Sequence, residues 1–236
     1  MTASQLADGV RAADPNASIW RYVEFWKLAD LLARSALWFA RATELGDDFE
    51  GSLPAVAPTV TRNPVSMEQI SRVRRNLRLA VYLNCWSVSE HESVALWSQY
   101  GSRNSLAIRS TAGRLASSLG QRDPAIKIGL VDYIDYTLPA EYDVNQLETF
   151  YFRKRLSFEH EREIRGWTFM SGKISIGEPP TDTPLGILVP VDLDGLVDVR
   201  GPRASDAFLG AVQDLTRKYG HPWEVRRSSL DDPAIF

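Results

Sequence analysis

The segment "FEHEREIRGW" (158–167) carries charged residues at every second position: Glu159, Glu161, Glu163 and Arg165. Alternate side chains of a β-strand share one face, so this spacing predicts a strand with a row of three carboxylates and one guanidinium. Such a row either protects an exposed sheet edge or faces a substrate. Bulky apolar neighbours at both ends of the segment favour the second alternative, with Arg165 holding adjacent carboxylates ionised.

Two more polar clusters lie next to aromatic residues. Arg21 stands between Trp20 and Tyr22, and Trp86 is followed by Ser87, Ser89, Glu90 and Glu92. Each cluster also has a structural explanation, because Arg21 suits a surface ion pair and the serines suit a helix N-cap. The chemistry of these residues therefore depends on whether the fold brings them together.

Common catalytic and metal-binding motifs are absent from the sequence. It contains no GxGxxG, GxxxxGK[ST], GxSxG or HExxH segment, and its three histidines, His91, His160 and His221, lie far apart. We therefore predict no metal site. The single cysteine, Cys85, is expected to be a small packing residue and not a nucleophile.

Composition indicates an ordinary globular protein. The chain has 236 residues, of which 44% are hydrophobic and 24% charged, and its formal net charge is −3. This charge gives no overall attraction to nucleic acid or anionic membranes. The chain has one cysteine and shows no signal peptide, and none of its apolar runs approaches the ~20 residues of a membrane span. We therefore predict a cytoplasmic protein without membrane association.

Hydrophobic periodicity predicts interleaved strands and helices without a regular βαβ repeat, which favours an α+β fold. We expect a flexible N-terminal arm at 1–18 and a single α+β domain at 19–236. The expected strands are 19–25, 36–41, 82–89, 105–111, 127–136, 158–167, 185–193, 197–201 and 222–230. The expected helices are 26–35, 66–83, 91–101, 112–120 and 203–220, with some helix in the middle of 137–158.

Several segments together resemble a known family. "WRYVEFWKLADLLARSALWFARATELGDDFEG", "NCWSVSEHESVALWSQYG", "FEHEREIRGW" and "PRASDAFLGAVQDLTRKYG" are similar to the bacterial domain of unknown function 2971 family. The resemblance extends from about residue 19 to residue 230. It implies a shared fold, but it does not name an activity.

The order of the polar clusters is also similar to the arginine–serine–glutamate pattern of ADP-ribosyltransferases. That resemblance implies an ADP-ribosyltransferase-like fold, with a mixed or antiparallel split β-sheet core and flanking helices. It implies that Arg21 binds the NAD phosphates, that Ser87 or Ser89 orders the nicotinamide side, and that Glu163 is catalytic. Glu161 would engage the acceptor, and Tyr22, Trp86 or Trp97 would stack on a ring of NAD.

The residue types suit this chemistry. Cleavage of the nicotinamide–ribose bond passes through an oxocarbenium-like state, which a carboxylate bound to the ribose hydroxyls stabilises. An arginine on the pyrophosphate supplies paired, charge-assisted hydrogen bonds. The sequence departs from the ADP-ribosyltransferase pattern at one point. No glycine follows Arg21 to let a phosphate approach the backbone closely.

Local basic runs bear on the acceptor. Arg72, Arg74, Arg75 and Arg78 lie on one expected helix, and "FRKRL" (152–156) precedes the glutamate segment. With Arg165, the residues Arg72, Arg75 and Arg78 are the candidates for binding an acceptor, either nucleic acid through its phosphates or a protein side chain. A solvated helix face and water as acceptor are the alternatives.

We therefore expect an NAD-consuming ADP-ribosyltransferase or NAD glycohydrolase. By analogy it would serve as a toxin or phage-defence effector, with an antitoxin or defence-system partner. Two alternatives come from other classes: a nuclease that uses Glu161, Glu163 and Arg165, and a noncatalytic ligand-sensing module.

Overall fold

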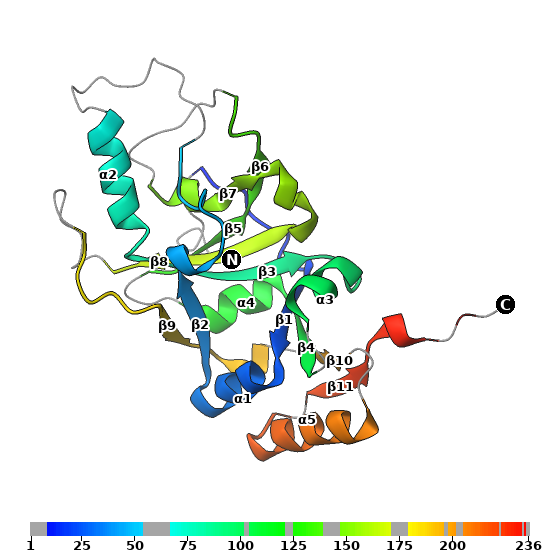
Figure 1. Cartoon of the computed structure of the whole chain (residues 1–236). Helices are drawn as coiled ribbons and strands as arrows, with labels where there is room; N and C mark the ends of the chain where they lie inside the picture. The colour runs from blue at the N-terminus through cyan, green and yellow to red at the C-terminus, as the bar shows by residue number, and fades with distance from the viewer. Residues whose placement is uncertain are drawn as a thin grey trace.

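The computed structural model describes residues 9–53, 67–101, 104–120, 125–138, 147–170, 179–195, 198–201, 205–221, 223–232 and 234. Figure 1 shows a large twisted sheet at the centre, with helices around it. Most neighbouring strands are antiparallel, and the β10–β11 pair is parallel. The predicted α+β class with a mixed, split sheet is confirmed.

The strands and helices have the following bounds. The strands are β1 Ser18–Glu24, β2 Ala36–Arg41, β3 Val81–Val88, β4 Ser105–Thr111, β5 Lys127–Leu130, β6 Asp132–Ile134, β7 Arg153–Arg155, β8 Glu163–Phe169, β9 Gly186–Pro190, β10 Asp198–Gly201 and β11 Glu224–Arg227. The α-helices are α1 Phe25–Arg34, α2 Met67–Leu77, α3 Val94–Tyr100, α4 Ala112–Leu119 and α5 Asp206–Lys218.

Strand β3 has three partners and divides the sheet. One edge pairs with β8 from Val81 to Ser87. The other edge is shared, because β1 pairs with the end of β3 at Trp20–Ser87 and β2 pairs with its start at Ala40–Leu83. Between these points, Asn84, Cys85 and Trp86 have no ladder partner on this edge among the described residues. A gap therefore opens between β1 and β2. Helix α1 connects these two strands along the chain.

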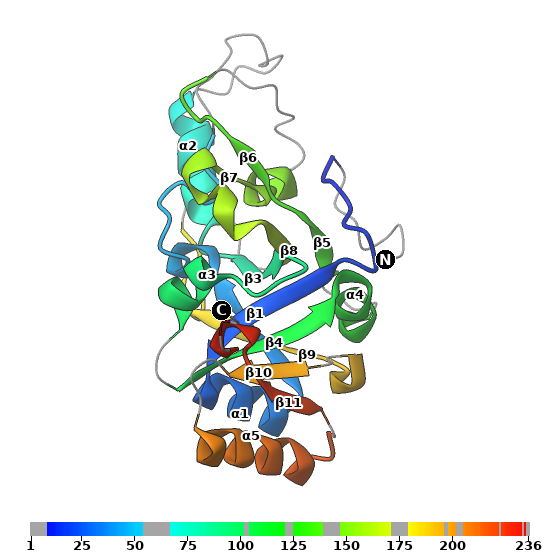
Figure 2. The same cartoon turned by 90° about the vertical axis from the view of Figure 1, so that its right-hand side faces the viewer.

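The main hydrophobic core lies on one face of the sheet. Helix α1 contributes Leu28, Leu31 and Leu32, whose helical spacing makes one apolar stripe. Helices α4 and α5 add apolar side chains to the same core, and α1 and α5 lie side by side in Figure 2. A second cluster on the opposite face of β3 and β8 includes Leu83, Tyr151 and Trp167. The site-bearing strands are thus fixed from both sides.

The expected strand 158–167 is wrong in its first half. Residues Leu156–Glu161 form a 3₁₀ helix, Arg162 turns the chain with a φ of 44°, and β8 begins at Glu163. Both neighbours of β8 stop at this level, since β3 pairs to it through Ser87 and β5 through Leu130. A strand that extended back to residue 158 would have no ladder partner on either side, and the chain turns instead.

Other boundaries also differ from the sequence expectation. The strand expected over 127–136 breaks at Val131, where the chain leaves β8, and β6 continues beside β7. The helix expected over 66–83 ends at Leu77, and residue 66 lies outside the described residues. The helix expected within 137–158 is a 3₁₀ helix, Leu147–Phe152, followed by β7.

The N-terminal segment packs on the sheet where it is described. Val10 and Ala13 are buried, and the backbone N–H of Leu130 donates to the carbonyl of Arg11 at 2.9 Å. Residues 1–8 of the expected arm lie outside the described residues. The packed part of the chain thus begins before β1. No helix among the described residues has the length and apolar character that a membrane crossing requires.

Candidate functional site

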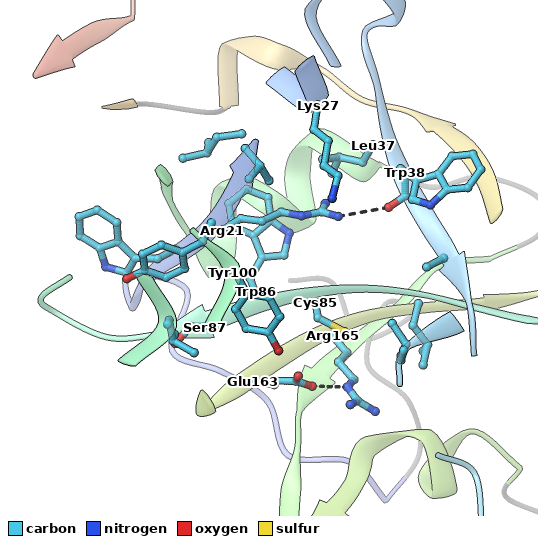
Figure 3. A pocket seen from close by; sticks show the side chains of 18 of the residues that line it. Arg21, Lys27, Leu37, Trp38, Cys85, Trp86, Ser87, Tyr100, Glu163 and Arg165 are labelled. Atoms are coloured by element: carbon cyan, nitrogen blue, oxygen red, sulfur yellow. Dashed lines mark hydrogen bonds and ion pairs between the residues drawn. The ribbon is translucent and has the colours of Figure 1, made fainter. Parts of the chain in front are cut away.

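A cavity of about 640 Å³ lies at the gap in the sheet. Arg21, Ser87 and Glu163 all line it, together with side chains from α1, β2, α3 and β7. The volume falls within the ~300–1,000 Å³ range of small-molecule sites. Figure 3 shows that the labelled side chains come from several strands and from helices α1 and α3 and gather around this space.

Strand register places the residues of the cavity on two faces. Ser87 is the cross-strand neighbour of both Trp20 and Glu163, so these three share one face. Arg21 alternates to the other face, where Trp86 also lies. Both sets line one cavity because β1 has already left β3 at Arg21. The cavity therefore passes through the split in the sheet.

Arg21 spans the gap from β1 to β2. Its Nη2 donates to the carbonyl oxygen of Trp38 at 3.4 Å, and its guanidinium lies 5.9 Å from the centre of the Trp86 ring. Burial lowers the pKa of Arg21 to about 10, which leaves it charged at neutral pH. Among the described residues, no carboxylate forms an ion pair with Arg21. The cavity thus presents a cation suited to an anionic ligand.

A buried ion-pair network supports the opposite side of the cavity. Arg165 is 0% exposed and binds both carboxylate oxygens of Glu50 at 2.6 and 2.7 Å. Its Nε donates to Glu163, and its Nη1 donates to the carbonyl of Tyr151 at 2.7 Å. All three nitrogens of the Arg165 guanidinium therefore donate hydrogen bonds inside the protein.

Lys154 joins the two glutamates of the E-x-E segment. Its Nζ donates to Glu161 Oε2 and, at 3.2 Å, to Glu163 Oε1. Lys154 is 6% exposed, and Glu161 and Glu163 are 2% and 7% exposed. Two neighbouring buried carboxylates would repel each other without a shared cation. Lys154 therefore offsets the repulsion between the two side chains.

The charge state of Glu163 follows from these neighbours. Burial opposes ionisation, but Arg165 and Lys154 outweigh it and lower the pKa of Glu163 to about 2. For Glu50, burial outweighs Arg165 and raises the pKa. At neutral pH, Glu163 is a fixed negative charge on the cavity wall.

This low pKa predicts an acid-dependent contribution to stability. The pKa of Glu163 is about 2 in the folded protein against the ordinary value of 4.5, so its ionised form stabilises the fold above about pH 4.5. That contribution is lost as the pH falls from 4.5 towards 2. Urea unfolding of the wild type and Glu163→Gln should show a stability difference that narrows over this interval. A difference that stays constant from pH 7 to pH 2.5 would contradict the assignment.

Cys85 lines the cavity beside this network. Burial, reinforced by the charge of Glu163, raises the pKa of its thiol to about 12. A protonated thiol is a poor nucleophile. The side chain therefore acts in packing, in line with the sequence expectation.

Several residues predicted for the site lie elsewhere. Ser89 is outside the cavity lining and its hydroxyl donates to the carbonyl of His91 at 2.6 Å, so Ser87 is the serine that the fold brings to the cavity. Trp97 is buried against the edge of Tyr22, with 4.8 Å between ring centres, and does not line the cavity. Tyr22 does line it, although its hydroxyl accepts a hydrogen bond from the N–H of Ser93 at 2.8 Å.

The predicted acceptor-binding arginines are also separate from the cavity. Arg72 and Arg75 are exposed on α2, and Arg78 donates to the carbonyl of Asp48 at 3.1 Å. None of the three lines the cavity. Arg165 lines it but is enclosed by Glu50 and Glu163, so the structure corrects its predicted role from acceptor contact to support of the carboxylates.

Sequence reasoning missed Lys154 and Tyr100, which line the cavity, and Glu50, which pairs with Arg165 beside it. Glu50 belongs to the "DDFEG" block and Tyr100 to "WSQYG", so the family resemblance covered both without giving either a role. Lys154 lies in the basic run "FRKRL", which suggested either an acceptor-binding patch or a solvated face. The described residues contain no group of three or more His, Cys, Asp or Glu side chains placed to hold one metal ion.

Comparisons with known proteins give one structural likeness to report. No family model matches the sequence, so membership of the domain of unknown function 2971 family stays a prediction. No curated protein matches it either. Among solved structures, DarT from Thermus sp. 2.9 in complex with ADP-ribosylated single-stranded DNA aligns over 93% of this chain and 96% of its own, with 9% identity and a TM-score of 0.43. A likeness of this degree assigns neither a substrate nor residue roles to this chain.

Proposed function

We propose that the cavity binds NAD as a substrate, cleaves its nicotinamide–ribose bond, and passes the ADP-ribosyl group to an acceptor or to water. The observation that carries the proposal is the convergence of Arg21, Ser87 and Glu163 on one cavity of about 640 Å³. These residues come from three different strands, β1, β3 and β8. The arrangement supplies a cation, a hydroxyl and a fixed carboxylate around one space.

Arg21 supports binding of the pyrophosphate. Arg21 is half-buried, and its guanidinium is charged and without a carboxylate partner among the described residues. An anionic ligand that reaches it would make charge-assisted hydrogen bonds without first displacing an internal ion pair. The exposed rings of Trp26 and Trp38 border the same cavity and offer surfaces for planar groups.

Glu163 supports cleavage of the glycosidic bond. Positive charge develops on the ribose as nicotinamide leaves, and a fixed carboxylate stabilises that charge. Lys154 and Arg165 bind one oxygen each of Glu163 and so determine its orientation before substrate enters. Nicotinamide departs with the bonding electron pair and needs no proton from the protein.

The first test measures nicotinamide release from NAD by wild-type protein and by Arg21→Gln. Loss of a charge-assisted hydrogen bond corresponds to about 1.5–3 kcal/mol, so we expect the KM for NAD to rise roughly ten- to a hundredfold. Arg114→Gln is the matched control, because Arg114 is exposed on α4 and lies outside the cavity lining. An unchanged KM in Arg21→Gln would exclude Arg21 as the residue that binds the pyrophosphate of NAD.

The same assay separates the alternative functions. Wild-type protein is incubated with labelled NAD, either alone or together with single-stranded DNA, RNA or a protein mixture. The labelled ADP-ribosyl group transferred to the acceptor is then counted in each mixture. Cleavage of the nucleic acid itself, dependent on magnesium, would replace the proposal with a nuclease. Saturable NAD binding without nicotinamide release under any condition would indicate a ligand-sensing module.

A further inference from the structure

Glu161 lines the cavity, but neighbouring side chains occupy both of its carboxylate oxygens. It is 2% exposed, and Lys154 holds its Oε2. Its Oε1 accepts hydrogen bonds from the Tyr100 hydroxyl at 2.9 Å and from Gln99 Nε2 at 3.0 Å. Tyr100 lines the same cavity and is far more exposed, at 48%. The hydroxyl of Tyr100 is therefore the accessible end of the Glu161 side chain's hydrogen-bond network.

Neighbouring groups fix the direction of the Tyr100 hydroxyl. Gln99 Nε2 donates to the Tyr100 oxygen at 2.9 Å, while Gln99 Oε1 lies 3.3 Å from His160 Nε2. With Gln99 donating to it, the Tyr100 hydroxyl places its own proton on Glu161 Oε1. One lone pair of the Tyr100 oxygen remains for a group in the cavity. In Figure 3 this hydroxyl points towards the strand that carries Glu163.

We propose that Tyr100 is a catalytic residue that carries the proton of the acceptor to Glu161. As an acceptor X–H bonds to C1′ of the ribose, the C1′–nitrogen bond breaks and nicotinamide leaves with the electron pair. The proton of X–H passes to the Tyr100 oxygen, and the Tyr100 proton passes to Glu161 Oε1. Lys154 holds the other oxygen of Glu161. The role of Glu161 in acceptor chemistry is thus exerted through Tyr100.

This inference rests on the proposed cleavage of NAD, and a competition between two small acceptors tests it separately. Methanol must lose a proton when it adds to C1′, whereas the azide anion has none to lose. Wild type, Tyr100→Phe and Tyr219→Phe are each incubated with NAD, methanol and azide, and both ribosyl products are quantified by mass spectrometry. Tyr219 is exposed and outside the cavity lining, so it is the matched control.

General base assistance contributes roughly 10²–10⁴-fold, so Tyr100→Phe should lower the methanol-to-azide product ratio at least tenfold. Tyr219→Phe should keep the wild-type ratio. The ratio does not depend on which step limits nicotinamide release, because both products form from the same enzyme-bound species. An unchanged ratio in Tyr100→Phe with NAD still cleaved would overturn the role of Tyr100 alone. Absence of nicotinamide release from the wild type would overturn the proposed function and this inference with it.

Discussion

Replacing Arg165 with methionine should lower the free energy of unfolding by about 3–5 kcal/mol, the cost of breaking a buried ion pair from one side. Arg165 is 0% exposed and binds Glu50, Glu163 and the carbonyl of Tyr151. Methionine fills a similar volume but donates no hydrogen bond. Glu50 and Glu163 would then be left buried with one nearby cation, Lys154, which also binds Glu161.

Urea unfolding followed by far-UV circular dichroism measures this loss. Arg34→Met is the matched control, because the Arg34–Asp30 pair on α1 has a 2.6 Å contact but exposed side chains. An exposed pair of this kind contributes about 0–1 kcal/mol. Equal losses in the two variants would show that the network around Arg165 does not support the fold.

Replacing Glu163 with glutamine should reduce kcat for nicotinamide release by about 10²–10³-fold, the usual effect of removing one preorganised electrostatic group. Glutamine keeps the shape and one carbonyl oxygen but loses the negative charge that offsets the developing oxocarbenium. The KM for NAD should change much less, because the pyrophosphate would be held by Arg21 on the other side of the split. The measurement is initial-rate kinetics over a range of NAD concentrations.

Glu159→Gln is the matched control for this substitution. Glu159 is an exposed carboxylate in the neighbouring 3₁₀ helix and lies outside the cavity lining. Its variant should retain wild-type kcat. A thermal melt of Glu163→Gln confirms folding at the assay temperature, and nicotinamide release at the wild-type rate from folded Glu163→Gln would exclude Glu163 as the catalytic carboxylate.

Much of the fold could be predicted from local pattern. The expected strands 36–41 and 105–111 have the bounds of β2 and β4, and the Leu28–Leu31–Leu32 stripe gives α1. Local pattern could not show where β8 begins, because that depends on where its neighbours β3 and β5 stop. Alternation alone therefore placed Glu159 in the same row as Glu163, and the turn at Arg162 separates them.

The site was predictable only in part. The resemblance to the arginine–serine–glutamate pattern pointed to Arg21, to Ser87 or Ser89, and to Glu163. The fold brings Arg21, Ser87 and Glu163 to one cavity. Lys154 could not be recognised, because its burial depends on how β7 packs beside residues 161 and 163. A lysine in a run of basic residues carries no local sign that it will be enclosed. Trp97 was assigned to the site because it is an aromatic residue near the candidate residues in sequence. An aromatic residue in such a position can equally belong to the core, and Trp97 packs with Trp20 and Ala107.

The shared edge of β3 has a mechanical consequence. The sheet has two arms, one that contains β1 and β4 and one that contains β2 and β9. Each arm is joined to this edge of β3 by two paired residues, Ile19 and Trp20 of β1 and Ala40 and Arg41 of β2. A change in the angle between the arms would disturb these short runs and the Arg21–Trp38 contact, while the long β1–β4 and β2–β9 ladders remain whole. A ligand that contacts both arms would hold them at one angle, so a ligand in the cavity would make the sheet more rigid.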